Sequence, residues 1–344
     1  MHNFLPEIST APARAGPTAN CIAHRSFSEG GPTANQKCHM QNRRIFIRNS
    51  AGFVAGSLAL PSFAKSFFIP SYPPPGIQLF TFFDVIDADV EGTLKRIAKI
   101  GYVEIESAFS KKGGYYGYTA KEFAALVKSL GLVWKSHHVL GAPFKMPPGM
   151  KMPVGADGKP ISLGKIRNLR DNMQALVDEA AEGGVEYLVC ANTPINTMDD
   201  IKSSIIVLNK TDEACKKAGL KFAYHNHDAE FHAVEGKVPY SLFLKETNVK
   251  MELDLAWSIK GGQDPVELFN QHPGRFPLWH IKDLDNTYKN ILPVGSGTID
   301  FKRIFAASET AGLKFYFIEH DMPKDPWGSI EKSISVLKLL APAN

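Results

Sequence analysis

The chain has 344 residues, of which 44% are hydrophobic, 22% charged and 10% aromatic. This composition is enough to bury a large core, and it excludes a disordered or coiled-coil chain. The formal net charge of +4 arises in residues 1–64, which hold six of the 39 Lys and Arg but only two of the 35 Asp and Glu. A nucleic-acid-binding protein normally carries a basic surplus that displaces counterions, so the charge balance of the remaining chain argues against that class.

Residues 40–64 have the pattern of an export signal. Arg43 and Arg44 precede the apolar residues 45–47, and a short apolar stretch and several small residues follow. This order is typical of secretion signals, and the arginine pair resembles a twin-arginine translocation signal. The stretch is too short and too rich in Gly and Ser to span a membrane. The sequence therefore predicts an exported, periplasmic protein that uses the twin-arginine machinery; the alternative is a chance arginine pair before a core helix.

The domain organisation follows from the same features. Residues 1–39 are of low complexity and contain the pentapeptide Gly-Pro-Thr-Ala-Asn twice. We expect them to be disordered, or to be an extension upstream of a natural start at Met40. Residues 65–75 are predicted to be a linker and residues 76–341 a catalytic domain. The two cysteines downstream of the signal form neither a disulfide framework nor a zinc-knuckle spacing.

Strand-like and helix-like segments alternate eight times after residue 75. Short runs rich in β-branched and aromatic residues are separated by segments of helical periodicity, such as 119–130. Glycines repeatedly stand between the end of a helix and the next strand, where they favour a C-cap. The predicted strands are 76–82, 102–107, 133–138, 187–193, 221–228, 249–257, 276–284 and 314–321.

Eight β/α units in this length predict an α/β protein that folds as a single (β/α)8 TIM barrel. We expect residues 139–164 and 229–238 to be insertions over the barrel mouth. A doubly wound open sheet is the alternative. However, no Gly-rich phosphate loop follows the first strand.

Several predicted strands carry charged residues at alternate positions. In a barrel, alternate residues face the interior, and active sites lie at the C-terminal ends of the strands. If the apolar positions face the helices, the inward residues are Glu104, Glu106, His225, His227, Glu252, Asp254, His280, Lys282 and Glu319. The histidines at strand ends are His137, His138, His225, His227, His280 and His320.

Four of these residues converge on one side of the mouth. A single histidine at a strand end is usually a packing residue, and Glu104 and Glu106 would then pair with cations such as Lys135 in the barrel floor. Burying two carboxylates and two imidazoles together without a cation costs free energy, and a divalent metal removes that cost. Mixed imidazole and carboxylate ligands suit Mn²⁺, Co²⁺, Fe²⁺ or Zn²⁺ better than Ca²⁺. The four residues are His225, Asp254, His280 and Glu319.

The order of short motifs resembles a known family. GIQLFTF and GYVEIES precede YHNHD, ELDLAW, WHIKD, VGSGTIDF and IEHD. Together they resemble the xylose isomerase-like TIM barrels, a superfamily that includes sugar phosphate isomerases/epimerases, ketose 3-epimerases, inosose dehydratases and endonuclease IV. The resemblance covers residues 76–341. It implies one divalent metal, held at strand ends by the positions that match His225, Asp254, His280 and Glu319.

One position departs from the family pattern. Ketose epimerases of the superfamily have a glutamate at the strand-five position, where it binds metal and moves protons, whereas this chain has His225, with His227 as the alternative ligand. A mechanism with two glutamates therefore does not carry over whole. Glu319 remains the candidate base, and Lys282, His227 and Glu106 are its candidate catalytic partners.

These residues predict proton abstraction next to a metal-bound carbonyl. The expected function is a metal-dependent isomerase or epimerase of an unphosphorylated sugar or keto-sugar. The alternative is a lyase or dehydratase that eliminates from a 3-keto-glycoside or an inosose-like substrate. A non-catalytic sugar-binding protein is a distant alternative, because it would not need the ligand cluster. A repair nuclease would need further metal ligands and a basic DNA-facing surface.

The expected partner is a small carbohydrate, with no nucleic acid and no membrane span, and a homo-oligomer stays open. Export separates the protein from most sugar phosphates, and the sequence shows no Arg/Lys cluster with a Gly-rich turn for a phosphate. His138, Trp257 and Phe82 are the candidate substrate-binding residues, because rings at the mouth can stack on a sugar. Packing inside the barrel is an equally simple role for the aromatic residues.

Replacing Arg43 and Arg44 together with Lys tests the export signal. We expect the precursor to stay in the cytoplasm, because lysine does not substitute for the arginine geometry that a receptor reads. Cell fractionation and immunoblotting measure the outcome. Normal export of the double variant would contradict the twin-arginine assignment.

Overall fold

The computed structural model describes residues 72–143 and 166–340. The predicted export signal, residues 1–39 and most of the predicted insertion at 139–164 lie outside the described residues. The catalytic domain expected over 76–341 contains all of the strands and helices given below.

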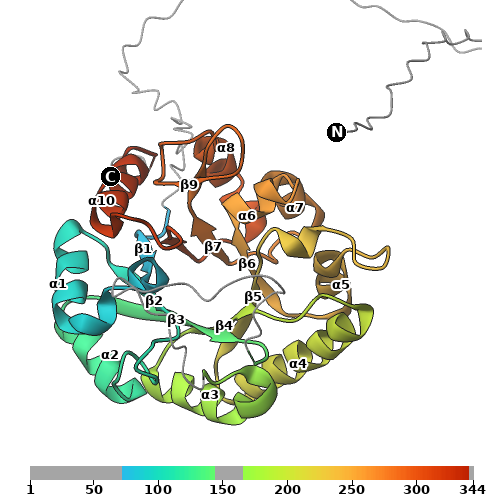
Figure 1. Cartoon of the computed structure of the whole chain (residues 1–344), viewed down its shortest axis with the longest axis horizontal. Helices are drawn as coiled ribbons and strands as arrows, with labels where there is room; N and C mark the ends of the chain where they lie inside the picture. The colour runs from blue at the N-terminus through green and yellow to red at the C-terminus, as the bar shows by residue number, and fades with distance from the viewer. Residues whose placement is uncertain (1–71, 144–165, 341–344) are drawn as a thin grey trace, which may run out of the picture. The chain divides into compact units, whose positions relative to one another are not determined.

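Eight parallel strands form a closed barrel in the order β1-β10-β7-β6-β5-β4-β3-β2. Figure 1 shows the strands at the centre and the helices around them. The barrel closes where the first strand pairs with the last, at Gly76 and Phe317, so the single (β/α)8 barrel is confirmed and the open sheet is excluded. The strands are β1 Gly76–Gln78, β2 Glu104–Ser107, β3 Val133–Leu140, β4 Tyr187–Asn192, β5 Lys221–His225, β6 Lys250–Asp254, β7 Leu278–Ile281 and β10 Phe315–Ile318.

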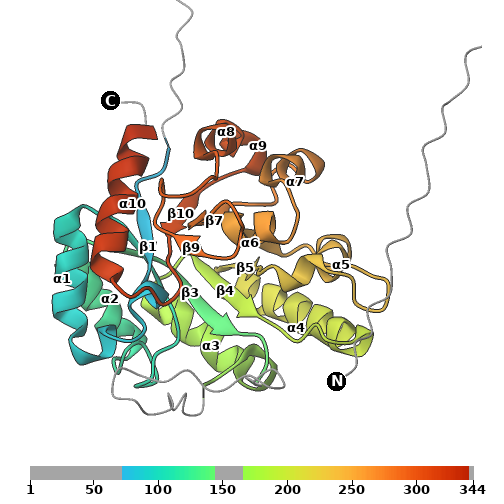
Figure 2. The same cartoon turned by 45° about the horizontal axis from the view of Figure 1, so that its top comes forward.

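Helices follow the strands and cover the outside of the barrel, as in Figure 2, where α10 runs along β1. The α-helices are α1 Val90–Ile100, α2 Ala120–Ser129, α3 Leu169–Gly183, α4 Met198–Lys217, α5 Pro239–Glu246, α6 Leu255–Lys260, α7 Pro265–Gln271, α8 Phe301–Ala306, α9 Ser308–Ala311 and α10 Pro326–Leu340. The short 3-10 helices are η1 Leu79–Phe82, η2 Ile86–Ala88 and η3 Ala229–Phe231. None of the helices in the described ranges is long and apolar enough to cross a bilayer.

The local sequence sets the helix ends. Thr119 and Glu122 form a capping box at the start of α2, and Phe123 and Val127 form its buried face. Gly101 ends α1 with φ of 110°, a left-handed conformation that is unfavourable for residues with a Cβ atom. The helix predicted at 119–130 is therefore confirmed, as is the role of a glycine between a helix and the next strand.

The interior of the barrel is divided into an apolar and a polar part. Outward residues of the strands pack against helices, as where Trp279 of β7 stacks on Phe269 of α7 at a centroid distance of 4.9 Å. On the inward side, an apolar cluster fills part of the barrel, and charged residues follow it toward the C-terminal strand ends. The apolar cluster consists of Tyr187, Val189, Ala223, Leu278 and Phe317.

Several predicted strands end earlier than expected, and in two of them a side chain at the strand end caps the next helix. The first stops at Gln78, whose side chain accepts a hydrogen bond from the Phe80 amide and caps η1. The sixth stops at Asp254, whose carboxylate accepts from the Trp257 amide at 2.8 Å and caps α6. Trp257 therefore lies in a helix next to the strand end. The segment predicted as an insertion at 229–238 forms η3 and a tight turn.

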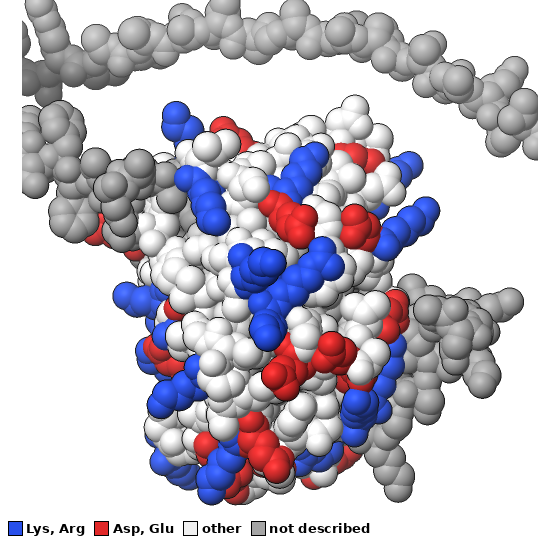
Figure 3. All heavy atoms as spheres, turned by 90° about the vertical axis from the view of Figure 1, so that its left-hand side faces the viewer, with Lys and Arg blue, Asp and Glu red and all other residues white. Residues whose placement is uncertain are grey.

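Basic and acidic side chains are interspersed on the face that Figure 3 shows, which carries α1 and α10. Arg96 of α1 pairs with Glu331 of α10 at 3.3 Å, for example. This face has no broad basic field of the kind that binds a nucleic-acid backbone, which agrees with the charge balance of the sequence.

A buried aspartate holds the loop after β7. The two short strands β8 Asp283–Leu284 and β9 Ile291–Leu292 form a hairpin there. Asp283 is 1% exposed, and its carboxylate accepts hydrogen bonds from the amides of Gly295, Gly297 and Ile299 at 2.9 to 3.1 Å. The aspartate of the WHIKD motif therefore fixes the VGSGTI segment.

Asp283→Ala should destabilise the protein by about 3 kcal/mol, because it leaves several buried amides without an acceptor. Urea denaturation measures this loss. Asp285→Ala is the control, because Asp285 also accepts from backbone amides of this loop but is partly exposed, so water can replace it. Equal losses in both variants would show that the buried network has no special role.

Candidate active site

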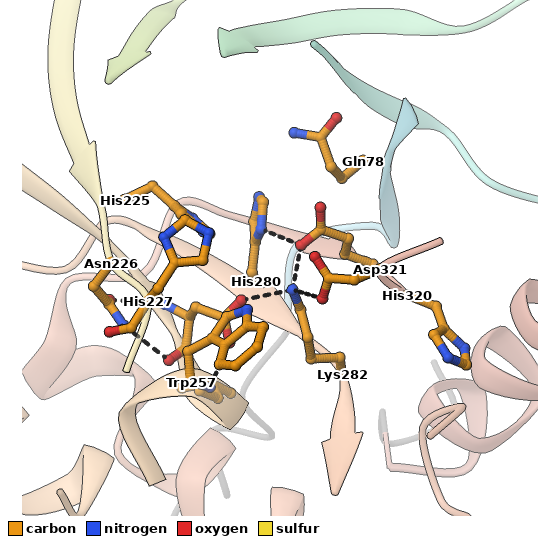
Figure 4. A network of polar contacts seen from close by, with 12 residues as sticks. Gln78, His225, Asn226, His227, Trp257, His280, Lys282, His320 and Asp321 are labelled. Atoms are coloured by element: carbon orange, nitrogen blue, oxygen red, sulfur yellow. Dashed lines mark hydrogen bonds and ion pairs between the residues drawn. The ribbon is translucent and has the colours of Figure 1, made fainter. Parts of the chain in front are cut away.

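Polar side chains from six of the strands, and from the residues that directly follow β7 and β10, meet inside the barrel near the C-terminal strand ends. All of those that form the buried cluster are at most 6% exposed. Figure 4 shows Lys282 pointing from β7 toward Asp321, with His280 beside it and His225 on the far side of His280. The cluster consists of Gln78, Glu106, His138, His225, Glu252, Asp254, His280, Lys282 and Glu319.

His280 is at the centre of the cluster. Its Nδ1 lies 3.0 Å from Oε2 of Glu319, and its Nε2 lies 2.5 Å from Oε1 of Glu106. Burial favours the neutral imidazole, but Glu252, Glu319 and Glu106 outweigh it and hold the pKa of His280 well above 6.5. The surrounding carboxylates therefore favour the protonated form of this ring.

Lys282 supplies the second buried cation. Its Nζ contacts Glu319 and lies 2.9 Å from Oδ2 of Asp254 and 2.8 Å from Oδ2 of Asp321. Burial opposes its charge, but Asp254, Asp321 and Glu319 together hold the pKa of Lys282 well above 10.5. Burial likewise opposes the charge of Glu319, yet Lys282 and His280 hold the pKa of this carboxyl well below 4.5. Asp321 lies beyond the end of β10 and was not among the residues predicted for the site.

Three imidazoles surround one oxygen of Glu252. His138 Nε2, His225 Nδ1 and His280 Nε2 lie 2.5, 3.1 and 3.2 Å from Glu252 Oε2. Burial and the nearby Glu106 raise the pKa of Glu252 to about 7 against the opposite effect of the histidines. Burial lowers the pKa of His138, but Glu106 and Glu252 outweigh it and raise this pKa to about 9. Glu252 was predicted to face inward but was not proposed as a site residue.

The two glutamates of β2 have different roles. Glu106 accepts hydrogen bonds from Ser136 and, at 2.7 Å, from Gln78, which fixes its carboxylate in the cluster. Glu104 instead lies 3.8 Å from Lys135, at the other end of the strand. Glu106 is thus a site residue, whereas Glu104 has the structural role that the sequence analysis offered as the alternative.

The histidines at the strand ends divide in the same way. His137 points away from the barrel interior, next to Tyr115, and its Nδ1 lies 2.7 Å from the Ser107 hydroxyl. His320 is 2.8 Å from the Ser329 hydroxyl. His227 is partly exposed, and its ring centroid is 5.0 Å from that of His225. Of the two histidines of strand five, His225 therefore belongs to the buried cluster.

The predicted substrate-binding residues do not come together. His138 is part of the cluster, and the Trp257 ring lies 5.7 Å from Lys282 Nζ and borders it. Phe82 is 1% exposed and packs against Trp327 at a centroid distance of 4.5 Å. The strand ends at Gln78, and η1 places the Phe82 ring in the core rather than in the cluster.

A pocket of about 230 Å³ opens beside His138. Its described wall includes Lys111, the glycines 113 and 114, and Arg167, a basic cluster with a Gly turn that the sequence analysis did not recognise. Arg167 pairs with Glu179 through two hydrogen bonds of 2.6 and 2.5 Å, and Lys111 pairs with Asp84 at 3.1 Å. These two cations are therefore paired with carboxylates of the protein, whereas a third, Lys112, also lines the pocket.

The cluster fits a divalent cation. The cluster contains four carboxylates and one lysine, which contacts Asp254, Glu319 and also Asp321, so the charges of Glu106 and Glu252 depend on protonated imidazoles or on a metal. Oε1 of Glu252 is buried without any hydrogen-bond partner, and a cation bound by this carboxylate would satisfy it. Two groups have ligand atoms within 4.8 Å of one another: His138, His225, Glu252 and His280, and Asp254, His280 and Glu319. The predicted metal ligands are thus distributed over both groups, which share His280.

A family model described as xylose isomerase-like TIM barrel matches residues 94–340. The chain belongs to the xylose isomerase-like TIM barrel family. The match covers the barrel from α1 to α10 and includes all four residues predicted to bind metal.

Individual relatives are more distant. Inosose dehydratase from Geobacillus thermodenitrificans is 23% identical over 157 residues, which are 40% of this chain and 52% of that protein. The chain thus spans about half the length of the curated relatives that it matches. A sugar phosphate isomerase/epimerase structure from Parabacteroides distasonis is 28% identical with a TM-score of 0.62, covering 78% of this chain and 96% of that one. The zinc-bound IOLI protein, 15% identical with a TM-score of 0.58 over 78% of this chain and 98% of that one, shares the fold.

A test with His137 checks whether a histidine outside the buried cluster is kept neutral in the folded protein. Burial, with the neighbouring His138, lowers the pKa of His137 to about 3, so the folded protein keeps this ring neutral where the unfolded chain binds a proton. Its contribution to stability is complete above pH 6.5 and is lost as the pH falls. Between pH 7 and 5 the free energy of unfolding should fall by about 2 kcal/mol more in the wild type than in His137→Gln.

Urea denaturation at both pH values measures this difference. His232→Gln, a change at an exposed histidine, is the matched control. If His137→Gln and the wild type show the same pH dependence, His137 is not held neutral in the folded protein.

Proposed function

We propose that the protein is a metal-dependent isomerase or epimerase of an unphosphorylated sugar or keto-sugar. The observation that carries this proposal is the contact of Glu319 with both His280 and Lys282 beside a buried group of metal-binding side chains. Isomerisation and epimerisation both begin with removal of a proton from a carbon next to a carbonyl. This step needs a base and a stabilised negative charge on oxygen.

A divalent metal bound in the cluster would polarise the substrate carbonyl and acidify the adjacent carbon. Glu319 then accepts the proton. Its two cationic neighbours keep it ionised but also lower its basicity. Lys282 has two further carboxylate partners, Asp254 and Asp321, so it can turn away from Glu319 when a substrate oxygen enters. In that arrangement Lys282 donates a hydrogen bond to the oxygen that becomes negative, and Glu319 becomes a stronger base.

The surroundings support a sugar without phosphate. Trp257 lies beside Lys282 and offers an apolar face on which a pyranose or furanose ring can stack. Among the described basic side chains near His138, Arg167 pairs with Glu179 and Lys111 pairs with Asp84, which makes these two less available to a phosphate. Export directed by residues 40–64 remains part of the proposal, and it would place the enzyme where free sugars and glycosides are more common than sugar phosphates.

A dehydratase or lyase is the second candidate, favoured by the similarity to inosose dehydratase. β-Elimination starts with the same proton transfer but also needs an acid for the departing oxygen. His227 is partly exposed, and its ring centroid is 5.7 Å from that of Trp257, so it is placed to protonate such an oxygen. An unsaturated product with loss of water or alcohol would identify this reaction.

Glu319→Gln tests the proposed base. The change keeps the shape of the side chain but removes most of its basicity, so exchange of the substrate's carbon-bound deuterium with water should fall about 10²-fold or more. NMR or mass spectrometry measures the exchange with metal-loaded enzyme and a panel of free ketoses, inososes and 3-keto-glycosides.

Glu104→Gln is the matched control, because it makes the same change in a buried glutamate that lies outside the cluster. It should exchange deuterium at the wild-type rate. If Glu319→Gln also exchanges at that rate, the base lies elsewhere, and Lys282 or His227 becomes the better candidate.

A further inference from the structure

The donor atoms of His138, His225, Glu252 and His280 lie within 4.8 Å of one another, close enough to become ligands of one metal ion. Ligands that bind an ion at about 2.1 Å and at angles of 90 to 109° lie about 3.0 to 3.4 Å apart. The three imidazole nitrogens of His138, His225 and His280 lie 2.5 to 3.2 Å from Glu252 Oε2. A small outward shift of these side chains therefore suffices to admit an ion.

Hydrogen bonds alone do not satisfy the polar atoms around Glu252. A carboxylate oxygen has two lone pairs, yet three ring nitrogens surround Oε2 of Glu252, while Oε1 of the same fully buried side chain has no partner. The nitrogens of His138 and His280 also share Oε1 of Glu106. A cation among these donors would replace several crowded contacts and give the carboxylate a partner for its second oxygen.

The other donor group is already occupied by an ammonium. Lys282 is fully buried, and its Nζ contacts Asp254, Glu319 and Asp321. A divalent ion bound by Asp254 and Glu319 would lie beside this buried positive charge and would compete with it for the same oxygens. The cluster thus has two layers. In one, Lys282 contacts Asp254 and Glu319; in the other, His138, His225, Glu252 and His280 have donor atoms that can bind a metal.

We propose that the resident metal binds to His138, His225, Glu252 and His280, and that Asp254 and Glu319 stay with Lys282. This set differs from the one implied by the family resemblance, which uses Asp254 and Glu319. Three imidazoles with one carboxylate suit Fe²⁺, Mn²⁺, Co²⁺ or Zn²⁺. The inference extends the proposed function and rests on it, because the proposed reaction is what requires a metal.

Charge and orientation agree with this assignment. Glu252 and Glu106 together balance a divalent ion while the imidazoles are neutral. His280 contacts Glu319 through Nδ1, which leaves Nε2 to face the metal, the arrangement in which a carboxylate orients a ligand histidine. Glu319 is then a positioning residue for the metal site as well as the proposed base, and it does not need to be a ligand.

Metal content measured after equilibration with limiting Zn²⁺ distinguishes the two sets. His138→Ala and Glu252→Gln should each bind Zn²⁺ at least 10-fold more weakly than the wild type, whereas Asp254→Asn should retain one Zn²⁺ per chain. Asn keeps the capping oxygen of α6, so this variant is a fair control. Loss of Zn²⁺ in Asp254→Asn together with retention in the other two variants would overturn the proposal.

A second measurement avoids the folding of variants. In wild-type protein with ¹⁵N-labelled histidine, Zn²⁺ should shift three imidazoles to values of metal-bound nitrogen, with His225 bound through Nδ1 and His138 and His280 through Nε2. Binding by two imidazoles or fewer, or an unshifted His138, would overturn the assignment. Neither readout depends on turnover, so a failed metal assignment leaves the proposed isomerase or epimerase testable by deuterium exchange.

Discussion

Four carboxylates buried inside one barrel are the constraint on which the rest of the site depends. Glu106, Glu252, Asp254 and Glu319 are each at most 6% exposed. Ionised carboxylates in such surroundings must be paired or neutralised, since unpaired burial costs several kcal/mol for each ion. Lys282 and the imidazoles of the cluster lie beside these carboxylates and can balance their charge. Each of these groups stands at an inward position of a strand or, for Lys282 and Glu319, directly after one, so the fold and the charge balance determine each other.

The sequence predicted the barrel and its inward residues because both depend on period-two alternation along the strands. The same rule separates adjacent histidines, and it sends His138 inward and His137 toward Tyr115. Alternation does not give the depth of a residue along the barrel axis, and Glu104 and Glu106 therefore looked equivalent although Glu104 lies in the floor.

Residues beyond the strand ends were harder to predict. Phe82 and Trp257 follow strands that stop early, because the side chains of Gln78 and Asp254 cap the next helical turn. Asp321 joins the cluster from a loop, where alternation has no meaning. Asn226 was overlooked because it is uncharged, yet its Oδ1 accepts from the Asp254 amide at 3.1 Å and ties the ends of β5 and β6 together. Such partners are far apart in the chain and are brought together only by the tertiary fold, so local sequence patterns do not reveal them.

The charged residues of the cluster form two layers, and this arrangement suggests which residues would decide between isomerisation, epimerisation and elimination. The layer with Glu106 and Glu252 is lined by imidazoles, whereas Lys282 of the other layer lies 5.7 Å from the Trp257 ring, which neighbours the partly exposed His227. Isomerisation, epimerisation and elimination share the first proton transfer, so the buried layers can serve all three. The outcome must then be decided by groups that meet the substrate farther out, where a second acid or base acts on a different carbon or oxygen. His227 and Trp257 are the described residues in that position, and they follow strands five and six directly.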